Sequence, residues 1–307
     1  MNLQLLLEQI LNGAQLGVTL FLMAAGLTLI FGIMNLVNLA HGSFYMVGAY
    51  LAVTFYGWTG SLVLGVLLAL PATLLVGVAI EVVALRTLYQ RDHLDQVLAT
   101  FGLILFFNEL IAIIWGRVGL FINLPDWLSG TVDFGEAFSY PLYRLVILAV
   151  GIAVAIGLWV MVARTRLGML VRAGASNRTM VAALGINIRL LYTLVFGLGA
   201  ALAGLAGAMV SPVYAVQPGM GDPVLIQALV VIAIGGIGSI RGALAGALIV
   251  GMVDTLGRAF LKPMLATLIS PSAAQSAGPA IASMLIYLLM AAVLALRPAG
   301  LFPPRGH

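Results

Sequence analysis

The sequence contains no cysteine and very little charge. Without cysteine, disulfides, thiol catalysis and cysteine-based metal sites are excluded, although the cellular compartment is not thereby identified. Charged residues make up only 8% of the 307 residues, whereas a soluble domain usually has about 25%. Hydrophobic residues make up 63%, and the mean hydropathy is +1.16. A chain with so few charges cannot cover its surface with groups that face water, so the sequence predicts an integral membrane protein.

Segments in which apolar and polar residues alternate over about 10 positions, the pattern of a membrane β-barrel, are also missing. Apolar runs of about 20 residues recur instead, each long enough to cross a bilayer as a helix. They lie near residues 11–33, 36–58, 61–84, 96–116, 141–163, 190–215, 224–239, 242–260 and 278–296. We therefore expect an all-α, polytopic membrane protein with one domain over 1–307 and about eight to ten transmembrane or re-entrant helices, some broken at glycine-rich motifs. Residues 261–278 are expected to form a local loop.

Lysine occurs only once, and no basic residue precedes Arg86. A cleaved signal peptide begins with a basic region, so we expect none here. The arginines gather in 85–95, in 164–189 and in the tail from residue 297, whereas 118–140 contains no basic residue. The positive-inside rule places the three basic segments in the cytoplasm and 118–140 outside. We interpret the net charge of +4 as this membrane signal and expect no nucleic-acid partner.

Several charged residues are hard to place in this topology. Arg117 and Arg144 flank the outer stretch, and Arg258 and Lys262 lie where the number of crossings also predicts the outer face. Glu109 and Asp254 fall inside apolar runs, where carboxylates are costly and usually face the interior of the protein. For both we favour a structural role, and the candidate partner of Glu109 is Arg117, about two helical turns away.

Motifs of enzymes and nucleotide-binding proteins are missing as well. The sequence has no cluster of carboxylates, no pair of histidines and no Gly-x-Ser-x-Gly elbow, so we do not expect an enzyme. The segment "GGIGSIRG" (235–242) resembles a phosphate-binding loop, but it lacks the Lys-Ser/Thr ending and follows an apolar run that does not read as a strand. We interpret it as a break between two apolar pieces, 224–234 and 243–253. Transporters use such breaks, with their free backbone groups, to contact a solute.

Glycine is abundant, with 36 residues, and many lie inside the apolar runs. The segment "GLGAALAGLAGAMV" (197–210) places small residues three and four positions apart. Small residues on one helix face let two helix backbones approach closely in lipid. We therefore predict that this segment packs against other helices and does not bind a nucleotide.

The basic segment 164–189 contains the pattern of a short helix. Ser176 or Asn177 can cap its start, and Gly185 can end it. Its apolar face would be formed by Met180, Val181 and Leu184. A helix of about eight residues is too short to be stable alone. It must therefore lie on the lipid headgroups or dock on a cytoplasmic partner, and the residues leave these two interpretations equally open.

The segment "NLVNLAHGSFYMVGAYL" (35–51) gathers polar residues in an apolar region. If it is helical, Asn35, Asn38 and His41 share one face. They then either bond to a neighbouring helix or line a translocation path at a break near Gly42, and both alternatives remain open. A lone histidine is a poor metal ligand set, so we expect no metal here. A proton relay is a further role that any intramembrane ionisable group can take.

Three motifs follow one another along the chain: "GLTLIFGIMNLVNLAHGSFYMVGAYLA" (26–52), "RAGASNRTMVAALGIN" (172–187) and "AIGGIGSIRGALAGALIVG" (233–251). The ending "LRPAGLF" (296–302) completes the pattern. Over essentially its whole length the sequence therefore resembles the permease subunits of branched-chain amino acid ABC transporters, of the LivH type. It departs from them at "GASNR", where other members carry an acidic residue, and at Arg241, where many carry proline.

The resemblance implies an importer of the bacterial cytoplasmic (inner) membrane. A periplasmic solute-binding protein would deliver the solute to a pair of related permease subunits embedded in membrane lipid. Two cytoplasmic ATPase subunits, which hold ATP and Mg, would drive alternating access, and this chain would bind no cofactor itself. The resemblance also favours docking for the helix in 164–189, because it identifies this segment as the coupling loop that contacts an ATPase.

The candidate functional residues follow from these motifs. The coupling residues are Arg172, Ala173, Asn177, Met180, Ala182, Ala183, Leu184 and Gly185. The candidate translocation path contains Asn35, Asn38, His41, Gly42, Ser43, Gly235, Gly236, Gly238 and Ser239. Two rival functions stay open. One is import of urea or short amides by the same machinery, and the other is ion-coupled transport without an ATPase, which would use His41, Glu109 or Asp254.

Overall fold

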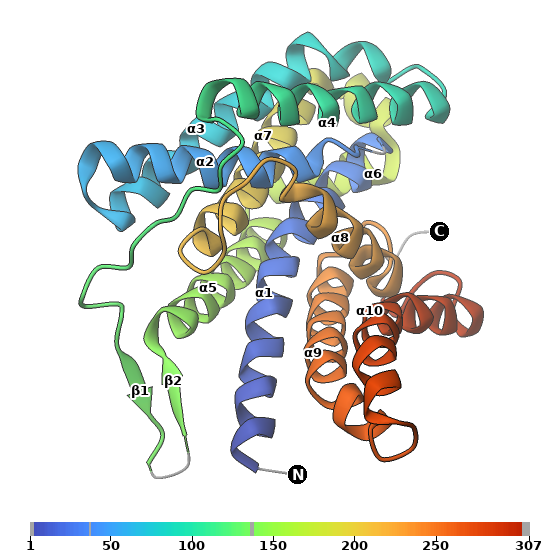
Figure 1. Cartoon of the computed structure of the whole chain (residues 1–307). Coiled ribbons are helices and arrows are strands. Elements are labelled where there is room, and N and C mark those ends of the chain that lie inside the picture. Colours follow the sequence, from blue (N-terminus) through green and yellow to red (C-terminus); the bar gives the residue numbers. More distant parts are fainter. Residues whose placement is uncertain (1–2, 37, 136–137, 303–307) are drawn as a thin grey trace.

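The computed structural model describes residues 3–36, 38–135 and 138–302, and most of them are helical (Figure 1). The α-helices are α1 (Leu3–Met34), α2 (His41–Thr59), α3 (Leu62–Val83), α4 (His93–Trp115), α5 (Leu142–Arg164), α6 (Arg166–Ala183), α7 (Ile188–Val210), α8 (Gly221–Gly235), α9 (Ile240–Leu265) and α10 (Pro271–Leu296). A short 3-10 helix, η1 (Leu85–Leu88), follows α3, and a hairpin of β1 (Thr131–Asp133) and β2 (Ser139–Pro141) precedes α5.

Within the described residues, seven helices are long and apolar enough to cross a membrane: α1, α3, α4, α5, α7, α9 and α10. Each predicted apolar run coincides with one helix, including α2 and the shorter α8. The prediction of an all-α, polytopic membrane protein is therefore confirmed.

Helices α1 and α7 form the interior, and 83% of the most apolar stretch of each is buried. Helix α1 packs along α9, and helix α7 packs along α2 and α3. Small residues permit these contacts, because a Cβ atom added at Gly48 of α2 would lie only 2.2 Å from the Cα atom of Gly204 in α7. A Cβ atom added at Gly77 of α3 would lie 2.4 Å from the Cβ atom of Ala200. The predicted role of 197–210 in helix packing is confirmed.

Helices α4, α5 and α10 lie on the outside, with only 22%, 17% and 11% of their most apolar stretches buried. Their outward side chains are large and apolar, for example Ile113 at 79% and Leu296 at 84% exposure. Exposed apolar faces of this extent on helices of membrane-spanning length suit contact with lipid.

The predicted sides of the membrane correspond to opposite ends of α1. At its C-terminal end, the Ile33 side chain lies 3.6 Å from a Cβ atom added at Gly174 of α6, in the basic segment 164–189. Arg86 of η1, in the other long basic segment, donates a hydrogen bond at 3.0 Å to the Thr193 hydroxyl of α7, just after 164–189. At its N-terminal end, Tyr140 of β2 donates a hydrogen bond to the Asn12 side-chain oxygen at 3.0 Å. Figure 1 accordingly shows the hairpin beside the N-terminal half of α1, with α6 at the far end. We call these the hairpin end and the basic end.

The predicted loop over 261–278 is wrong, because both neighbouring helices extend into it. Helix α9 continues to Leu265 and α10 begins at Pro271, so α9 is also longer than the predicted half-length piece. The Ser270 hydroxyl accepts a hydrogen bond from the Ala273 N–H at 3.4 Å and caps α10. Pro271 then has the fixed backbone angle that suits the first position of a helix.

Candidate functional site

A cavity of about 870 Å³ opens at the hairpin end, between α1, α5, α8 and α9. Its polar lining residues are Gln9, Asn12, Gln15, Thr19, Arg144, Tyr214, Gln217, Gln227, Asp254, Thr255 and Arg258. Its apolar lining includes Leu16, Leu20, Val210, Met220 and Val224. The residues predicted for the translocation path do not line it, although Tyr45, two positions after Ser43, does. The volume lies within the range of small-molecule sites, about 300–1,000 Å³.

The cavity carries charges of both signs. Asp254 of α9 is 4% exposed, and its Oδ2 atom accepts a hydrogen bond from Nε of Arg258 at 2.9 Å. The Oδ1 atom of Asp254 has no hydrogen-bond partner among the described residues. From α5, the Arg144 guanidinium donates a hydrogen bond to the side-chain oxygen of Asn12. The cavity therefore offers one unpaired carboxylate oxygen and two guanidinium groups.

Apolar side chains lie beside these charges, on α1, α7 and α8. Gln15 and Thr19 carry the polar lining deeper along α1, where they are 8% and 4% exposed. A small zwitterion with an aliphatic chain would find a matching group for each of its parts. Its carboxylate would meet an arginine, its ammonium group the free oxygen of Asp254, and its chain the apolar wall.

The segment between α1 and α2 is broken and does not form the continuous helix considered for 35–51. Helix α1 ends at Met34, and Asn35 has φ of 51°, a left-handed conformation that asparagine adopts more readily than most residues. The prediction that Asn35, Asn38 and His41 share a helical face is wrong. Asn35 is exposed, whereas Asn38 is 1% exposed and His41 is fully buried.

Buried polar groups gather after this break. Nε2 of His41 lies within hydrogen-bonding distance, 3.2 Å, of the Met23 carbonyl oxygen in α1. Among the described residues, the Asn38 amide, His41 Nδ1 and the Ser43 hydroxyl have no partner. A buried polar group without a partner costs about 1–3 kcal/mol, so a water molecule or solute that bonds with it is stabilised there. These unpaired polar groups are therefore close in sequence to Tyr45, a residue of α2 that lines the cavity.

The predicted break at 235–242 is confirmed. Helix α8 ends at Gly235 and α9 begins at Ile240, and the chain turns between them through Gly236 and Gly238, with φ of 106° and 83°. The Ser239 hydroxyl accepts a hydrogen bond from a backbone N–H at 3.1 Å and caps α9.

The two glycine motifs of the candidate path lie apart. Gly42 packs against Gly221 at the first residue of α8, since a Cβ atom added to Gly42 would lie 2.7 Å from the Gly221 carbonyl oxygen. The motif around Gly235 lies at the other end of α8. There the N–H of Phe302 donates a hydrogen bond to the Gly235 carbonyl at 2.9 Å, so the C-terminal segment covers the break.

Helix α6 is kinked, and its sequence explains the kink. The Thr165 hydroxyl accepts a backbone N–H at 3.1 Å and caps its start. At Asn177 the backbone leaves helical angles (φ −152°, ψ 91°), and the Asn177 Oδ1 atom accepts a hydrogen bond from the Met180 N–H at 2.9 Å. This confirms the predicted cap of a second, short helix. Residues 166–176, where no helix was predicted, are also helical, and Val171 packs into the core.

Gly185 ends this short helix as predicted. Its φ is 82°, and its N–H donates a hydrogen bond to the Ala182 carbonyl at 3.0 Å. The N–H of Ile186 donates to the Val181 carbonyl at 3.4 Å. These two bonds define a Schellman motif, which requires a left-handed residue at the position of Gly185.

The short helix leaves apolar side chains uncovered. Val181 is 4% exposed and packs inward, whereas Met180 and Leu184 are 58% and 73% exposed. The three residues therefore do not form the single apolar face that was predicted. Of the candidate coupling residues, all are exposed except the half-buried Ala173. The helix is held from one side and presents apolar groups on the other.

Glu81 was not identified from the sequence. It lies in the last turn of α3, at the basic end of the molecule. Its carboxylate is fully buried and accepts hydrogen bonds from Arg86 at 3.2 Å, from the Tyr89 hydroxyl at 2.5 Å and from the Thr193 hydroxyl at 2.8 Å. Burial and the bond to Glu81 raise the pKa of Tyr89, so its hydroxyl remains a donor. Glu81 thus ties α3, η1 and α7 together. The available signal was an acidic residue at the end of an apolar run, shortly before Arg86.

Glu109 is placed differently from the prediction. Its side chain is 62% exposed because α4 is an outer helix, so the prediction of a buried carboxylate is wrong. Its predicted pairing with Arg117 is confirmed at 2.7 Å. The adjacent Asn108 donates a hydrogen bond to the Asp222 carboxylate at 3.3 Å and links α4 to α8.

An all-α membrane protein with a charged cavity at one end and a capped, exposed helix at the other has the features of a membrane transport protein. The chain belongs to the family described as the permease component of branched-chain amino acid transport systems, whose model matches residues 9–294.

Curated relatives agree with this family. The high-affinity branched-chain amino acid transport system permease protein BraD of Pseudomonas aeruginosa is 34% identical over 267 residues, which cover 82% of this chain and 86% of that protein. The permease protein LivH of the corresponding system of Escherichia coli K12 is 31% identical over 271 residues, or 83% and 87% of the two chains. The ribose import permease protein RbsC of Escherichia coli K12 is 28% identical over 72% of this chain and 71% of its own length. No solved structure gives a significant match.

Proposed function

We propose that this chain is the membrane-spanning subunit of a binding-protein-dependent ABC importer for branched-chain amino acids, in a bacterial inner membrane. The observation that carries the proposal is the cavity, in which Asp254, Arg144 and Arg258 lie beside an aliphatic wall. This combination suits a zwitterion with a branched hydrocarbon chain. The names of BraD and LivH support the same class of solute.

The solute enters the cavity from a periplasmic binding protein at the hairpin end. Beyond Leu20 and Tyr45, the unpaired groups of Asn38, His41 and Ser43 supply the next polar contacts along the path. A path with few polar binding groups holds the solute weakly, and weak binding permits its release. The binding protein then supplies most of the selectivity. The glycine motif at 235–239 acts at the basic end, where it joins α8, α9 and the C-terminal segment.

The energy comes from outside this chain. Two ATPase subunits hold ATP and Mg and dock on the coupling loop, 164–189, with Met180 and Leu184 inserted at the contact. Exposed apolar side chains on a helix that is capped at both ends support this role, because such groups gain stability when a partner covers them. A second, related permease subunit and membrane lipid cover the outer helices.

Import of urea or short amides by the same machinery is the second candidate. The cavity has five side-chain amides, Gln9, Asn12, Gln15, Gln217 and Gln227, and such groups bond well with neutral polar solutes. One relative of this chain is named as a ribose import permease, so the names of related chains refer to more than one class of solute.

The test is uptake of labelled leucine in the host, with this gene deleted and then restored. Unlabelled isoleucine, valine, urea, short amides and ribose are added as competitors. The proposal predicts that leucine uptake is lost on deletion, is recovered on restoration, and is reduced only by isoleucine and valine. Unchanged leucine uptake, with loss of urea, amide or ribose uptake, would replace the solute.

A further inference from the structure

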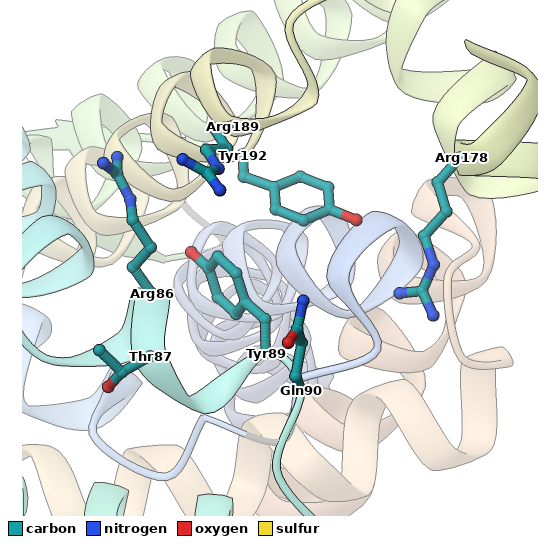
Figure 2. A pocket seen from close by; sticks show the side chains of 7 residues that line it. All are labelled: Arg86, Thr87, Tyr89, Gln90, Arg178, Arg189 and Tyr192. Carbon is teal, nitrogen blue, oxygen red and sulfur yellow. The ribbon is translucent and has the colours of Figure 1, made fainter. Parts of the chain in front are cut away.

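A second cavity, of about 580 Å³, lies at the basic end and is lined by η1, α6 and α7. Its main side chains are Arg86, Arg178, Arg189, Tyr89, Tyr192 and Gln90. Figure 2 shows that Arg178 of α6 faces the open space from the side opposite Arg86, with the two tyrosine rings between them. The rings of Tyr89 and Tyr192 pack edge to face, with centroids 5.3 Å apart, and both line the cavity.

The charge of this cavity is positive. Arg86 is neutralised by Glu81, since the two side chains form an ion pair at 3.2 Å. Neither Arg178 nor Arg189 has an ion pair or a side-chain hydrogen bond within the described ranges. Two guanidinium groups from different elements thus face one space without a counter-charge. Such an arrangement favours a ligand with several anionic oxygens, because arginine binds phosphate with paired hydrogen bonds.

Exposed apolar side chains lie close in sequence to the arginines of the cavity, at the end of α3 and on α7. Val83, three positions before Arg86, is 78% exposed, and Leu190, directly after Arg189, is 56% exposed. One turn further along α7, Leu194 is 49% exposed. A ligand that joins an anionic group to hydrocarbon chains would cover both kinds of surface. A free phosphate would cover only the arginine side chains and would leave the apolar side chains exposed.

We propose that this cavity binds the phosphate headgroup of an anionic phospholipid of the cytoplasmic leaflet, with Arg178 and Arg189 as its main ligands and the acyl chains along Val83, Leu190 and Leu194. Bound there, the lipid bridges the short helix of α6, which carries Arg178, to η1 and α7. The position of the coupling loop would then depend on lipid composition. The inference goes beyond the proposed function and does not require it, since lipid binding is measured without transport.

The experiment uses the full chain in nanodiscs of neutral phosphatidylcholine with increasing phosphatidylglycerol. Native mass spectrometry counts the phosphatidylglycerol molecules retained. The pocket variant is R178Q/R189Q, and the matched control is R91Q/R166Q, which removes the same charge at two exposed arginines outside the cavity. We expect at least about tenfold weaker retention for the pocket variant, because it loses the charge-assisted hydrogen bonds of two arginines to the phosphate, whereas the control loses none. The control should stay close to the wild type, and R178K/R189K, which keeps the charge but loses the paired hydrogen bonds, should fall between the wild type and the pocket variant.

Three results would overturn the proposal. Equal loss in the control would show general surface charge only. Displacement of phosphatidylglycerol by millimolar inorganic phosphate, with no preference for lipid, would identify a free-phosphate site. Full lipid retention by R178Q/R189Q, together with loss of ATPase copurification, would identify the ligand as a carboxylate of the ATPase. Thermal unfolding of every variant in detergent checks that each one is folded.

Discussion

At the scale of single residues, the end of the short helix in α6 depends on the backbone of Gly185. Its φ of 82° is accessible to glycine and asparagine but is strained for a β-branched residue. Among the described residues, no atom beyond its two chain neighbours lies within 4 Å of a Cβ atom added there, so a substitution acts through this strain. We predict that Gly185→Val lowers leucine uptake about tenfold with normal membrane insertion, since a left-handed β-branched residue costs about 1–2 kcal/mol or more.

Gly185→Asn is the matched control for this prediction. Asparagine has a side chain at least as large as that of valine, yet it tolerates the left-handed conformation, so uptake should stay close to the wild type. Equal uptake by the valine and asparagine variants would argue against a coupling role for this turn. Membrane insertion is measured by the amount of each variant in isolated membranes.

Asp254 allows a test of the cavity. Asp254→Asn keeps the shape of the side chain and removes the negative charge that we expect to meet the ammonium group of the solute. We predict about a tenfold lower maximal rate of leucine uptake, a loss typical of a charged hydrogen bond. The half-saturating concentration should change little, because the binding protein sets it. The control is Asp126→Asn, at an exposed aspartate of the hairpin end, and equal rates in the two variants would contradict the assigned role of Asp254.

Residue-scale prediction from the sequence succeeded where the cause was local. The Asn177 cap and the Gly185 stop follow from side-chain and backbone preferences within a few positions. It failed where the partner is distant in sequence. Glu81 is bonded by Thr193, 112 positions away, and no pattern around either residue indicates the contact. The shared face of Asn35 and His41 failed because one left-handed residue breaks the helical register.

At the scale of elements, the short helix of α6 exposes Met180 and Leu184 for a partner. We predict that M180S/L184S weakens copurification of the ATPase about tenfold or more, because each buried aliphatic side chain contributes about 1.5–3 kcal/mol. The folded chain should keep its thermal stability, since neither side chain packs in the core. Leu268→Ser, at a side chain that is 79% exposed between α9 and α10, is the control and should retain the ATPase. Unweakened copurification of M180S/L184S would place the docking surface elsewhere.

Helix α7 depends on close approach to α2. Gly48→Leu, in α2, would force the two backbones apart, since a Cβ atom added at Gly48 would lie 2.2 Å from the Cα atom of Gly204. Overpacking of a core costs about 1–3 kcal/mol or more, so we predict a clear fall in melting temperature and in yield. Gly102→Leu, in α4, meets no atom within 4 Å and should leave both unchanged. The measurement is thermal unfolding in detergent, and equal melting temperatures would argue against this packing.

The elements themselves were largely predictable, because the thickness of a bilayer fixes the length of an apolar run. Helix boundaries that depend on capping residues and prolines were harder to predict. The sequence 261–278 contains serines, prolines and glycine, which suggest a loop, yet Ser270 and Pro271 start a helix. The same residue types serve loops and helix starts, and only the packing of α10 on α9 decides between them.

At the scale of the whole molecule, two ends with different chemistry are separated by the length of α1. Two of the three arginines that are hard to place in the simple topology, Arg144 and Arg258, line the cavity at the hairpin end. Arg258 is paired with Asp254 and adds no net charge there, whereas Arg144 keeps its charge and is held in the cavity by a hydrogen bond to the Asn12 amide oxygen. No sequence rule could have predicted the cavity, because its walls come from six helices and the turn between α7 and α8.

The central claim is that ATP hydrolysis drives amino acid import through this chain. The most direct measurement is labelled leucine uptake into proteoliposomes that contain the chain, its partner permease and the ATPases, with loaded binding protein outside. The account predicts accumulation with ATP inside the vesicles and none with a non-hydrolysable analogue, whatever ion gradient is applied. Accumulation driven by a proton or sodium gradient without ATP would contradict it and would establish ion-coupled transport instead.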